Sequence, residues 1–549
     1  MNNKIDGQPM KRVLMLAAEN GLLPGAKVGG MADVIRDLPG ALYPLNVCVD
    51  VAMPSYGFLH RQTAALKIAK VTLSFYGEPH WVDLYLAPHP EFPELNLYLF
   101  DHPLFEDGGK IYSPSSGDRP FADDANKFAL FCAAVAESLA TGALSMPDCL
   151  HLHDWHCGVM AFLRACSPYH QALQSIPVVM SIHNLAIQGT RPLSQEHSSL
   201  QAWFPAQYAS LDDDQLSNIT DPQYPNCFNP MRCAIIFSDR VHLVSPSYAN
   251  EVLLASNHDK GFYGGEGLEK DLALKQAQKG VFGILNGCEY PPEPQKGRKI
   301  SVKKALESGG GDYLNLLLDS AEQAIQAWLA HQPYVRSVDQ IALLTLNRLR
   351  RSARDSIEPR VILTSVGRLT DQKMRILCYQ DSSGVSTLEK LLIRLASTVP
   401  KGVFILLGSG DDKIEAQLTK LASKFSNLLF VNGFDLPLSQ ALYDHGSLFI
   451  MPSSFEPCGI SQMLAMRSGQ PCLVHGVGGL KDTVTDGDDG FVFTGEDLPQ
   501  QAEQLLVRFN QLQGLMGLPK WQKICDSARQ KRFSWQSSAQ QYVDLLYQF

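Results

Sequence analysis

The chain has 549 residues, which is too long for one ordinary hydrophobic core and predicts two large domains. Apolar residues make up 45% of the chain and charged residues 19%, which is typical of a globular protein that buries its cores. The net charge of −9 argues against nucleic acid and an anionic membrane as partners, although it leaves room for a local basic cleft.

The cysteines and the apolar runs indicate the compartment. Twelve cysteines are scattered without a C-x-x-C pair, and several lie inside apolar runs, as Cys132 and Cys472 do. The first ten residues contain no apolar region of a signal peptide, and no run approaches the roughly 20 apolar residues that span a bilayer. We therefore expect a soluble protein of the reducing cytoplasm.

A glycine-rich loop follows the first predicted strand. Residues 13–17 predict the first strand of a doubly wound α/β sheet, and residues 33–42 predict a helix that is interrupted by a Pro-Gly pair at positions 39 and 40. In the loop between them, a Gly pair lets the backbone approach a ligand, Lys27 supplies a charge, and Asp33 is expected to cap the helix. No Gly-Lys-Ser/Thr follows, so this is not a Walker loop.

Two further predicted strands of this half end in clusters of polar residues. Residues 150–156 contain three histidines and Asp154, but alternation along a strand sends neighbouring side chains to opposite faces, so we predict no metal site there. Residues 178–182 form a buried strand that ends at His183 and Asn184. A histidine in such a place is more often structural than catalytic, yet ligands bind at the carboxyl ends of strands in open α/β sheets, so the residues alone leave both interpretations open.

The second half begins after a connector. Residues 289–294 predict an extended linker, and residues 297–358 are largely helical in pattern with one break at 308–311. Strands are predicted at 361–366, 403–407 and 428–431. Arg368 and Lys373 follow the first of these strands. Such charges are usually solvated, but a planar guanidinium and a compact ammonium can also hold phosphate oxygens.

Two glycine-containing loops precede short helices near the end of the chain. Residues 448–451 predict a buried strand, and after it Glu456 stands at the tip of a loop, with Pro457 where a helix would begin. The N–H groups of residues 458–460 would then favour an anion, and residues 476–484 offer a second helix start. Each loop alone is more often structural. Together they suggest a diphosphate and a sugar.

The sequences of these motifs resemble those of the bacterial glycogen synthase and plant starch synthase family. The strongest match is Glu456-Pro-Cys-Gly-Ile-Ser-Gln-Met463, and the resemblance covers roughly residues 11–290 and 360–549 in the family's order. It implies two Rossmann-like domains facing each other across a deep cleft in the GT-B arrangement. The expected boundaries are 1–287 for the acceptor side, 288–532 for the sugar-nucleotide side with a divergent region at 290–360, and 533–549 for a helix that crosses back.

The resemblance also implies an activity and a set of residues. Glucose would pass from ADP-glucose to the 4-OH of an α-1,4-glucan such as glycogen, with retention at the anomeric carbon and without metal or cofactor. Catalytic roles carry over to Glu456, His183, Asp154, Arg368 and Lys373. Substrate binding carries over to Lys27, Gly29, Gly30, Glu19, His156, Asn184, Asn286, Gly408, Gly410, Cys458, Gly459, Gly478, Gly479 and Thr483.

Departures from the family pattern leave alternatives open. Met31, Ile187 and Met374 replace the usual residues, a Trp-x-Pro segment is missing after the hinge, and residues 381–384 look like an insertion. One alternative is another retaining nucleotide-sugar transferase, although those often carry a glutamate eight residues after the first, where this chain has Leu464. A catalytically weak glucan-binding relative is a second, and a phosphorylase-like pyridoxal enzyme a third. Donor preference, chain length, regulation and oligomeric state stay open.

Overall fold

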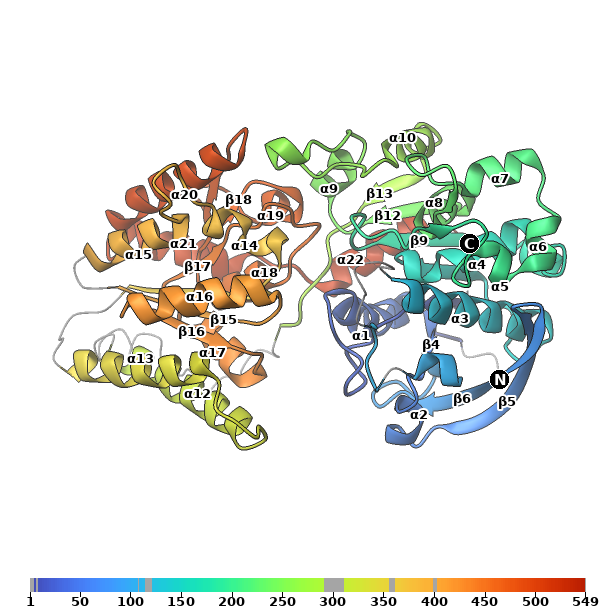
Figure 1. Ribbon diagram of the computed structural model, residues 1–549, viewed down its shortest axis with the longest axis horizontal. Coiled ribbons are helices and arrows are strands. Elements are labelled where there is room, and N and C mark those ends of the chain that lie inside the picture. Colours follow the sequence, from blue (N-terminus) through green and yellow to red (C-terminus); the bar gives the residue numbers. More distant parts are fainter. Residues whose placement is uncertain are drawn as a thin grey trace. The chain divides into compact units, whose positions relative to one another are not determined.

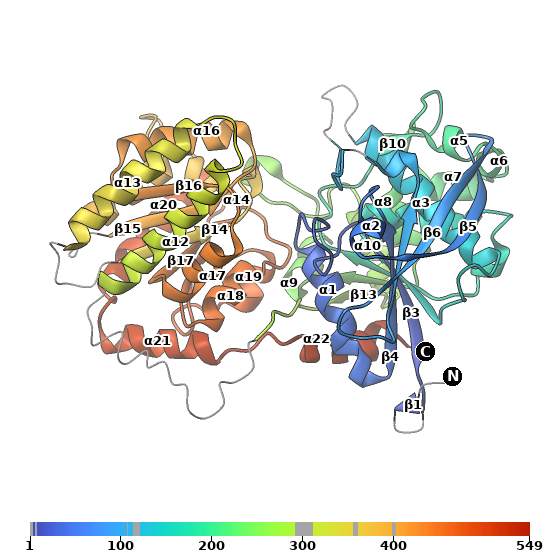
Figure 2. The ribbon, with the colours of Figure 1, turned by 90° about the horizontal axis from the view of Figure 1, so that it is seen from below.

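The computed structural model describes residues 4–5, 8–106, 108–113, 121–290, 311–354, 361–397 and 402–548. The chain divides into two compact units, which Figures 1 and 2 show from two directions. Unit 1 comprises Met1–Ser256, Tyr263–Glu289 and Ser534–Phe549, and unit 2 comprises Asn257–Phe262 and Tyr290–Phe533.

Unit 1 is built on a nine-stranded sheet with the order β13-β12-β9-β8-β3-β4-β7-β6-β5. Along the chain these strands are β3 (Lys11–Leu16), β4 (Val47–Pro54), β5 (Leu66–Phe75), β6 (Glu78–Pro88), β7 (Asn96–Asp101), β8 (Cys149–His153), β9 (Val178–Ile182), β12 (Arg240–Leu243) and β13 (Val281–Gly283). All neighbours pair in parallel except β5 with β6 and β6 with β7. Without the β5–β6 hairpin, the order is that of a doubly wound sheet, and its switch point lies between β3 and β8.

Two groups of helices accompany this sheet. Helix α4 packs against α3 and α8, whereas α1 packs against α22. The principal helices of unit 1 are α1 (Met31–Leu42), α3 (Ala122–Ala140), α4 (Gly158–Cys166), α8 (Pro230–Phe237), α9 (Pro246–Glu251), α10 (Glu269–Ala277) and α22 (Trp535–Gln541), and shorter ones are α2 (Leu59–Gln62), α5 (Leu200–Trp203), α6 (Pro205–Ala209) and α7 (Asp213–Ile219).

The prediction for α1 was wrong at two points. The helix begins at Met31 with Gly30 as N-cap, so Asp33 lies in the first turn and instead accepts a hydrogen bond from Lys27. Pro39 lies inside the helix, which continues to Leu42. A proline costs about 3 kcal/mol in a helix interior, and the buried face of α1 offsets that cost by packing into unit 1.

The last residues of the chain are fastened to unit 1. Trp535 Nε1 donates to Asp37 Oδ2 at 3.0 Å, and Ser538 Oγ donates to the carbonyl of Leu285 at 2.7 Å. The hydroxyl of Tyr547 is hydrogen bonded to His151 Nδ1 at 2.5 Å. Because these partners come from three separate stretches, α22 and the residues after it are integrated into unit 1.

Unit 2 contains a six-stranded parallel sheet with the order β16-β15-β14-β17-β18-β19. Its strands are β14 (Ile362–Val366), β15 (Val403–Gly408), β16 (Leu428–Asn432), β17 (Leu448–Met451), β18 (Cys472–His475) and β19 (Phe491–Phe493). Numbered along the chain the order is 3-2-1-4-5-6, as in a dinucleotide-binding fold, with the switch point between β14 and β17. Apolar runs of the sequence predicted four of these strands, β14 to β17, because parallel strands are buried on both faces.

The helices of unit 2 are α12 (Gly311–Leu329), α13 (Ser337–Arg354), α14 (Asp371–Cys378), α15 (Thr387–Ser397), α16 (Asp412–Lys424), α17 (Leu436–His445), α18 (Ser461–Arg467), α19 (Gly478–Thr483), α20 (Leu498–Gln513) and α21 (Pro519–Gln530). Helix α12 packs against α13 and α17, and α12 and α13 account for most of the described part of the divergent region. The expected break at 308–311 and the linker at 289–294 fall largely outside the described residues. In the described part of the chain, no helix is both long and apolar enough to cross a bilayer.

Candidate active site

Two loops of unit 2 meet at the switch point of its sheet, one after β14 and the other after β17. Glu456 lies in the second loop and is only 7% exposed. Its Oε2 accepts from Lys373 Nζ at 3.0 Å and from Ser453 Oγ at 3.0 Å. Because a buried carboxylate is stable only when it is paired, these two donors keep Glu456 in place at the carboxyl edge of the sheet.

The same two loops are also joined through Gln372, which was not among the predicted site residues. Gln372 Nε2 donates to the carbonyl of Phe455 at 2.7 Å, and the backbone N–H of Ser454 donates to the carbonyl of Gln372 at 2.8 Å. Gln372 and Ser453 lie inside or beside the motifs quoted from the sequence. Their position next to Lys373 and Glu456 was the only signal that could have found them.

Arg368 stands on the outer part of the β14 loop. Its side chain is exposed, and within the described residues its guanidinium forms no hydrogen bond or ion pair. Lys373, in contrast, lies in the first turn of α14 and is only 24% exposed. The two cations that the sequence brings together therefore differ, since one is already paired and the other is open to solvent.

The glycines after β15 allow its loop to lie against the loop of Arg368. A Cβ atom on Gly408 would come within 2.2 Å of the carbonyl oxygen of Gly367, and one on Gly410 within 2.4 Å of that of Leu369. The backbone N–H of Leu369 donates to the carbonyl of Ser409 at 2.9 Å. The structure thus shows a packing reason for both glycines, beside their predicted role in substrate binding.

The second predicted helix start lies close to the first. The backbone N–H of Gly479 donates to the carbonyl of Glu456 at 3.0 Å, and a Cβ atom there would come within 2.3 Å of the carbonyl oxygen of Cys458. Thr483 is buried, and its hydroxyl donates to the carbonyl of Gly479 at 2.6 Å and accepts from Gln462 Nε2 at 3.2 Å. The amide of Gly479 is therefore used within the protein.

The expected helix start at Pro457 was wrong. Helix α18 begins at Ser461, and Gly459 has a φ of +76°, a left-handed conformation that a helix cannot continue through. Cys458 and Gly459 consequently form a turn before the helix. Gly478 also has a positive φ and opens α19, so both glycine positions shape tight turns beside Glu456.

In unit 1 the carboxyl ends of β8 and β9 bring three of the predicted residues together. Asp154 Oδ1 accepts from the backbone N–H of His183 at 2.7 Å and from that of Asn184 at 3.3 Å. Asp154 is buried in the left-handed region with a φ of +55°, and burial raises its pKa to about 7. Burial also lowers the pKa of His183 to about 3, so this histidine is neutral.

The glycine-rich loop of unit 1 closes around Glu19. One carboxylate oxygen of the buried Glu19 accepts from the backbone N–H groups of Val28 at 2.8 Å and Gly29 at 2.5 Å, and the other accepts from the hydroxyl of Tyr112 at 2.7 Å. Tyr112 was missed because it lies 93 residues from Glu19 in the sequence. Lys27 is 45% exposed and pairs with Asp33 at 2.6 Å.

The remaining predicted residues of unit 1 are Gly30, His156 and Asn286. Gly30 is the N-cap of α1, directly after the loop that Glu19 holds. His156 is buried and stacks on Trp155 with ring centroids 4.4 Å apart, and burial lowers its pKa to about 3. His156 Nδ1 and Asn286 Oδ1 are buried without a hydrogen-bond partner in the part of the chain that the structure describes. Such groups are the ones that a ligand can satisfy.

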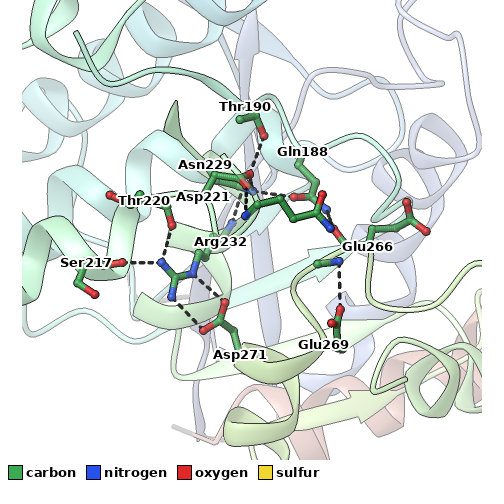
Figure 3. A network of polar contacts seen from close by, with 12 residues as sticks. Gln188, Thr190, Ser217, Thr220, Asp221, Asn229, Arg232, Glu266, Glu269 and Asp271 are labelled. Carbon is green, nitrogen blue, oxygen red and sulfur yellow. Dashed lines mark hydrogen bonds and ion pairs between the residues drawn. The ribbon is translucent and has the colours of Figure 1, made fainter. Parts of the chain in front are cut away.

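Figure 3 shows a polar network that holds Gln188 and Thr190, in the stretch after β9. Asn229 Nδ2 donates to Gln188 Oε1 at 2.6 Å and to Asp221 Oδ2 at 2.7 Å, and Gln188 Nε2 donates to the carbonyl of Glu266 at 3.0 Å. The adjacent Arg232 pairs with Asp271 at 2.8 Å. This network ties Gln188 and Thr190 to Asp221, to the N-cap of α8 and to the stretch before α10.

No group of three or more histidine, cysteine, aspartate or glutamate side chains within the described ranges has the spacing of a metal site. The three histidines of residues 150–156 are accounted for by other contacts. His151 is hydrogen bonded to Ser181 at 2.7 Å, His153 to His183 at 2.9 Å, and His156 stacks on Trp155.

Known proteins resemble the chain over its whole length. Residues 12–274 match the model of the starch synthase catalytic domain, and residues 375–510 match that of glycosyl transferases group 1. A glycogen synthase of Streptococcus equi subsp. equi is 31% identical, with 97% of this chain and 99% of that protein covered. The chain belongs to the glycogen synthase family. A glycogen synthase of Gloeobacter violaceus is 30% identical over 97% of this chain and 98% of its own length.

Two solved structures resemble the chain in fold. The catalytic domain of starch synthase IV from Arabidopsis thaliana, solved with ADP and acarbose, has a TM-score of 0.68 and 25% identity, with 98% of each chain covered. Sucrose-phosphate synthase from Thermosynechococcus elongatus, at 15% identity, a TM-score of 0.50 and 98% coverage of each chain, shows the fold alone. The predictions of a glycosyltransferase of the glycogen and starch synthase family, and of an α/β fold with two Rossmann-like units, are confirmed.

Proposed function

We propose that this glycogen synthase family member transfers glucose from ADP-glucose to the non-reducing 4-OH of an α-1,4-glucan, with retention at the anomeric carbon. The observation that carries the proposal is the pairing of Glu456 with Lys373 at the switch point of the unit 2 sheet. Open α/β sheets bind nucleotides at such a point. The ADP in the related Arabidopsis starch synthase IV structure supports an adenosine diphosphate here, and its acarbose supports a glucan-like partner.

The chemical task of such a reaction is to stabilise the leaving group. When the bond between the anomeric carbon and the diphosphate oxygen breaks, the diphosphate keeps the electron pair, and positive charge develops on the sugar. Arg368 can hold phosphate oxygens with a planar fork, and Lys373 adds a compact charge. We propose that these groups, with Lys27 and the amides around Cys458, take the place of a metal, and that Glu456 faces the sugar.

Unit 1 contributes groups of a different kind. Asp154, His183 and Asn184 lie together at the carboxyl edge of its sheet, and His156 and Asn286 each have a buried polar atom without a partner among the described residues. Carboxylate, imidazole and amide groups are suited to sugar hydroxyls because each can donate or accept in a fixed direction. We assign them to the glucose and the glucan.

One assay tests the proposal. Purified protein is incubated with labelled ADP-glucose or UDP-glucose and a glycogen primer, in buffer with EDTA and no added metal. We expect label in the glucan from ADP-glucose, and digestion by an enzyme specific for α-1,4 bonds should release it. Transfer to a small acceptor such as a sugar phosphate, or no transfer from either donor, would refute the assignment.

The same proposal places the enzyme in the cytoplasm. All twelve cysteines are free thiols, and most of them are buried in the two cores. Free thiols persist in a reducing compartment. To test this, cells are lysed rapidly in an alkylating reagent and the cysteines of the protein are counted. All twelve cysteines should be modified, but only once the protein has been denatured. Disulfides in the isolated protein would contradict the assignment.

A further inference from the structure

Two histidines from neighbouring strands are hydrogen bonded to each other beside the candidate site of unit 1. His153 is the last residue of β8, and His183 follows β9 directly. His153 Nδ1 lies 2.9 Å from His183 Nε2, and the two rings stack with centroids 5.3 Å apart. His153 is completely buried, whereas His183 is half-buried and reaches the surface of unit 1.

Both rings are neutral in this environment. Burial lowers the pKa of His153 well below its usual value, and neighbouring His151, His183 and His242 further disfavour a positive charge there. Burial likewise lowers the pKa of His183 to about 3, helped by His242. A neutral imidazole has one N–H donor and one acceptor nitrogen, so one ring must donate to the other.

The second nitrogen of His153 decides which ring donates. His153 Nε2 is buried and has no hydrogen-bond partner among the described residues. If His153 Nδ1 accepted, the proton of His153 would lie on Nε2 as an unpaired buried N–H, which is the costlier kind of orphan. His153 therefore donates from Nδ1 to His183 Nε2. The proton of His183 then lies on Nδ1, and no hydrogen bond within the described residues uses that atom.

The ring of His153 is itself held from behind. It stacks on His151 with ring centroids 4.3 Å apart. His151 in turn is hydrogen bonded through Nδ1 to the hydroxyl of Tyr547 and through Nε2 to Ser181 Oγ at 2.7 Å. Because both nitrogens of His151 are engaged, its ring is fixed and offers a constant packing surface to the ring of His153, whose Nδ1 faces His183.

We propose that His153 is a positioning residue that holds His183 in the tautomer with its proton on Nδ1, so that His183 offers a hydrogen-bond donor to a hydroxyl of the transferred glucose. The inference rests on the proposed function, in which His183 contacts that glucose. His153 does not touch the substrate and acts only through His183.

Two substitutions separate the donor from the volume of the ring. His153→Leu keeps an apolar side chain in the buried space but has no donor, whereas His153→Asn places an amide donor at the position of Nδ1. We expect His153→Leu to lower kcat by about tenfold to a hundredfold, the cost of a misplaced group near the reaction, with a smaller change in the KM for glucan. His153→Asn should recover most of the loss. Equal kcat in His153→Leu and the wild type would overturn the proposal.

A spectroscopic readout makes the test independent of activity. In protein with ¹⁵N-labelled histidine, the ring nitrogen shifts of His183, assigned by comparison with His183→Gln, should show a protonated Nδ1 in the wild type and in His153→Asn. His153→Leu should move that proton toward Nε2. His170→Leu removes another buried histidine and should leave the signal unchanged. If the wild type makes no glucan, the proposed function fails, but a His183 proton on Nε2 in the wild type is what refutes the role of His153.

Discussion

The Nζ atom of Lys373 lies 3.0 Å from Oε2 of Glu456, so a cation from α14 and a carboxylate from the loop after β17 form one ion pair. The loops that carry them are joined again by two hydrogen bonds through Gln372. This places the residue proposed for the diphosphate and the residue proposed for the sugar at a fixed distance. The electrostatic part of the candidate site is therefore organised within unit 2 before any substrate arrives.

Replacing the carboxylate of Glu456 tests its role directly. Glu456→Gln keeps the shape of the side chain and its contact with Ser453 but removes the charge beside Lys373. We expect kcat for glucan synthesis to fall by about a hundredfold or more, while the protein remains folded by circular dichroism. Glu389→Gln is a matched control, since it breaks a similar ion pair with Lys424 at 2.7 Å in the same unit. Near-normal turnover of Glu456→Gln would remove Glu456 from the mechanism.

Arg368 is expected to act on the donor rather than on stability. Because its guanidinium has no partner within the described residues, Arg368→Ala should leave the melting temperature unchanged. The dissociation constant for ADP, measured by calorimetry, should rise by about tenfold to a hundredfold, the value of one charge-assisted contact. Arg368→Lys should restore little, because a lysine cannot form the bidentate contact. The control Arg348→Ala removes an exposed arginine from α13, and equal ADP affinity in both alanine variants would contradict the assignment.

The sequence predicted several parallel strands of both sheets, but it predicted none of the strands β4 to β7 of unit 1 and placed the ends of the helices poorly. Residues 448–451 are an uninterrupted apolar run, residues 178–182 are apolar except for Ser181, and the structure has β17 and β9 at these positions. The helix start after Glu456 was misplaced by four residues, because a proline marks a possible first turn whereas the positive φ of Gly459 that prevents it is not visible in a sequence.

The candidate site shows the same division. The resemblance to the family indicated Glu456, Lys373, Asp154 and His183, all of which follow predicted strands at the carboxyl edges of the two sheets. Tyr112, which holds Glu19, and Tyr547, which holds His151, could not be found in this way. Their partners lie 93 and 396 residues away, and only the packing of the folded chain brings them together.

Asp154 should make the stability of unit 1 depend on pH. Its pKa is about 7 in the folded protein and about 3.9 in an unfolded chain, so between these values only the folded state keeps the proton. The stabilising contribution is therefore complete below about pH 4 and is lost as the pH rises through 7, by at most about 4 kcal/mol. Urea unfolding of the wild type and of Asp154→Asn at several pH values measures this difference.

The control for this prediction is Asp148→Asn, which changes a carboxylate just before β8 that accepts from the backbone N–H of Arg12 at 2.8 Å. Its free energy of unfolding should change with pH from 5 to 8 as that of the wild type does. The free energy of unfolding of Asp154→Asn should not fall as the pH rises toward 7. Parallel curves for the wild type and Asp154→Asn would show that Asp154 is already ionised in the folded protein at pH 5.

Gly479→Ala tests the contact between the start of α19 and the loop of Glu456. The added Cβ would lie 2.3 Å from the carbonyl oxygen of Cys458, so the two segments must separate, and the hydrogen bond from Gly479 to Glu456 must lengthen. We expect a loss of about 1–3 kcal/mol in the free energy of unfolding, together with weaker ADP binding. Gly514→Ala is the control, because its Cβ would meet only the carbonyl oxygen of Gln511 at 3.8 Å. Full stability and ADP affinity in Gly479→Ala would mean that the turn at Cys458 is free to move away, and that the amides there are not held in place for a diphosphate.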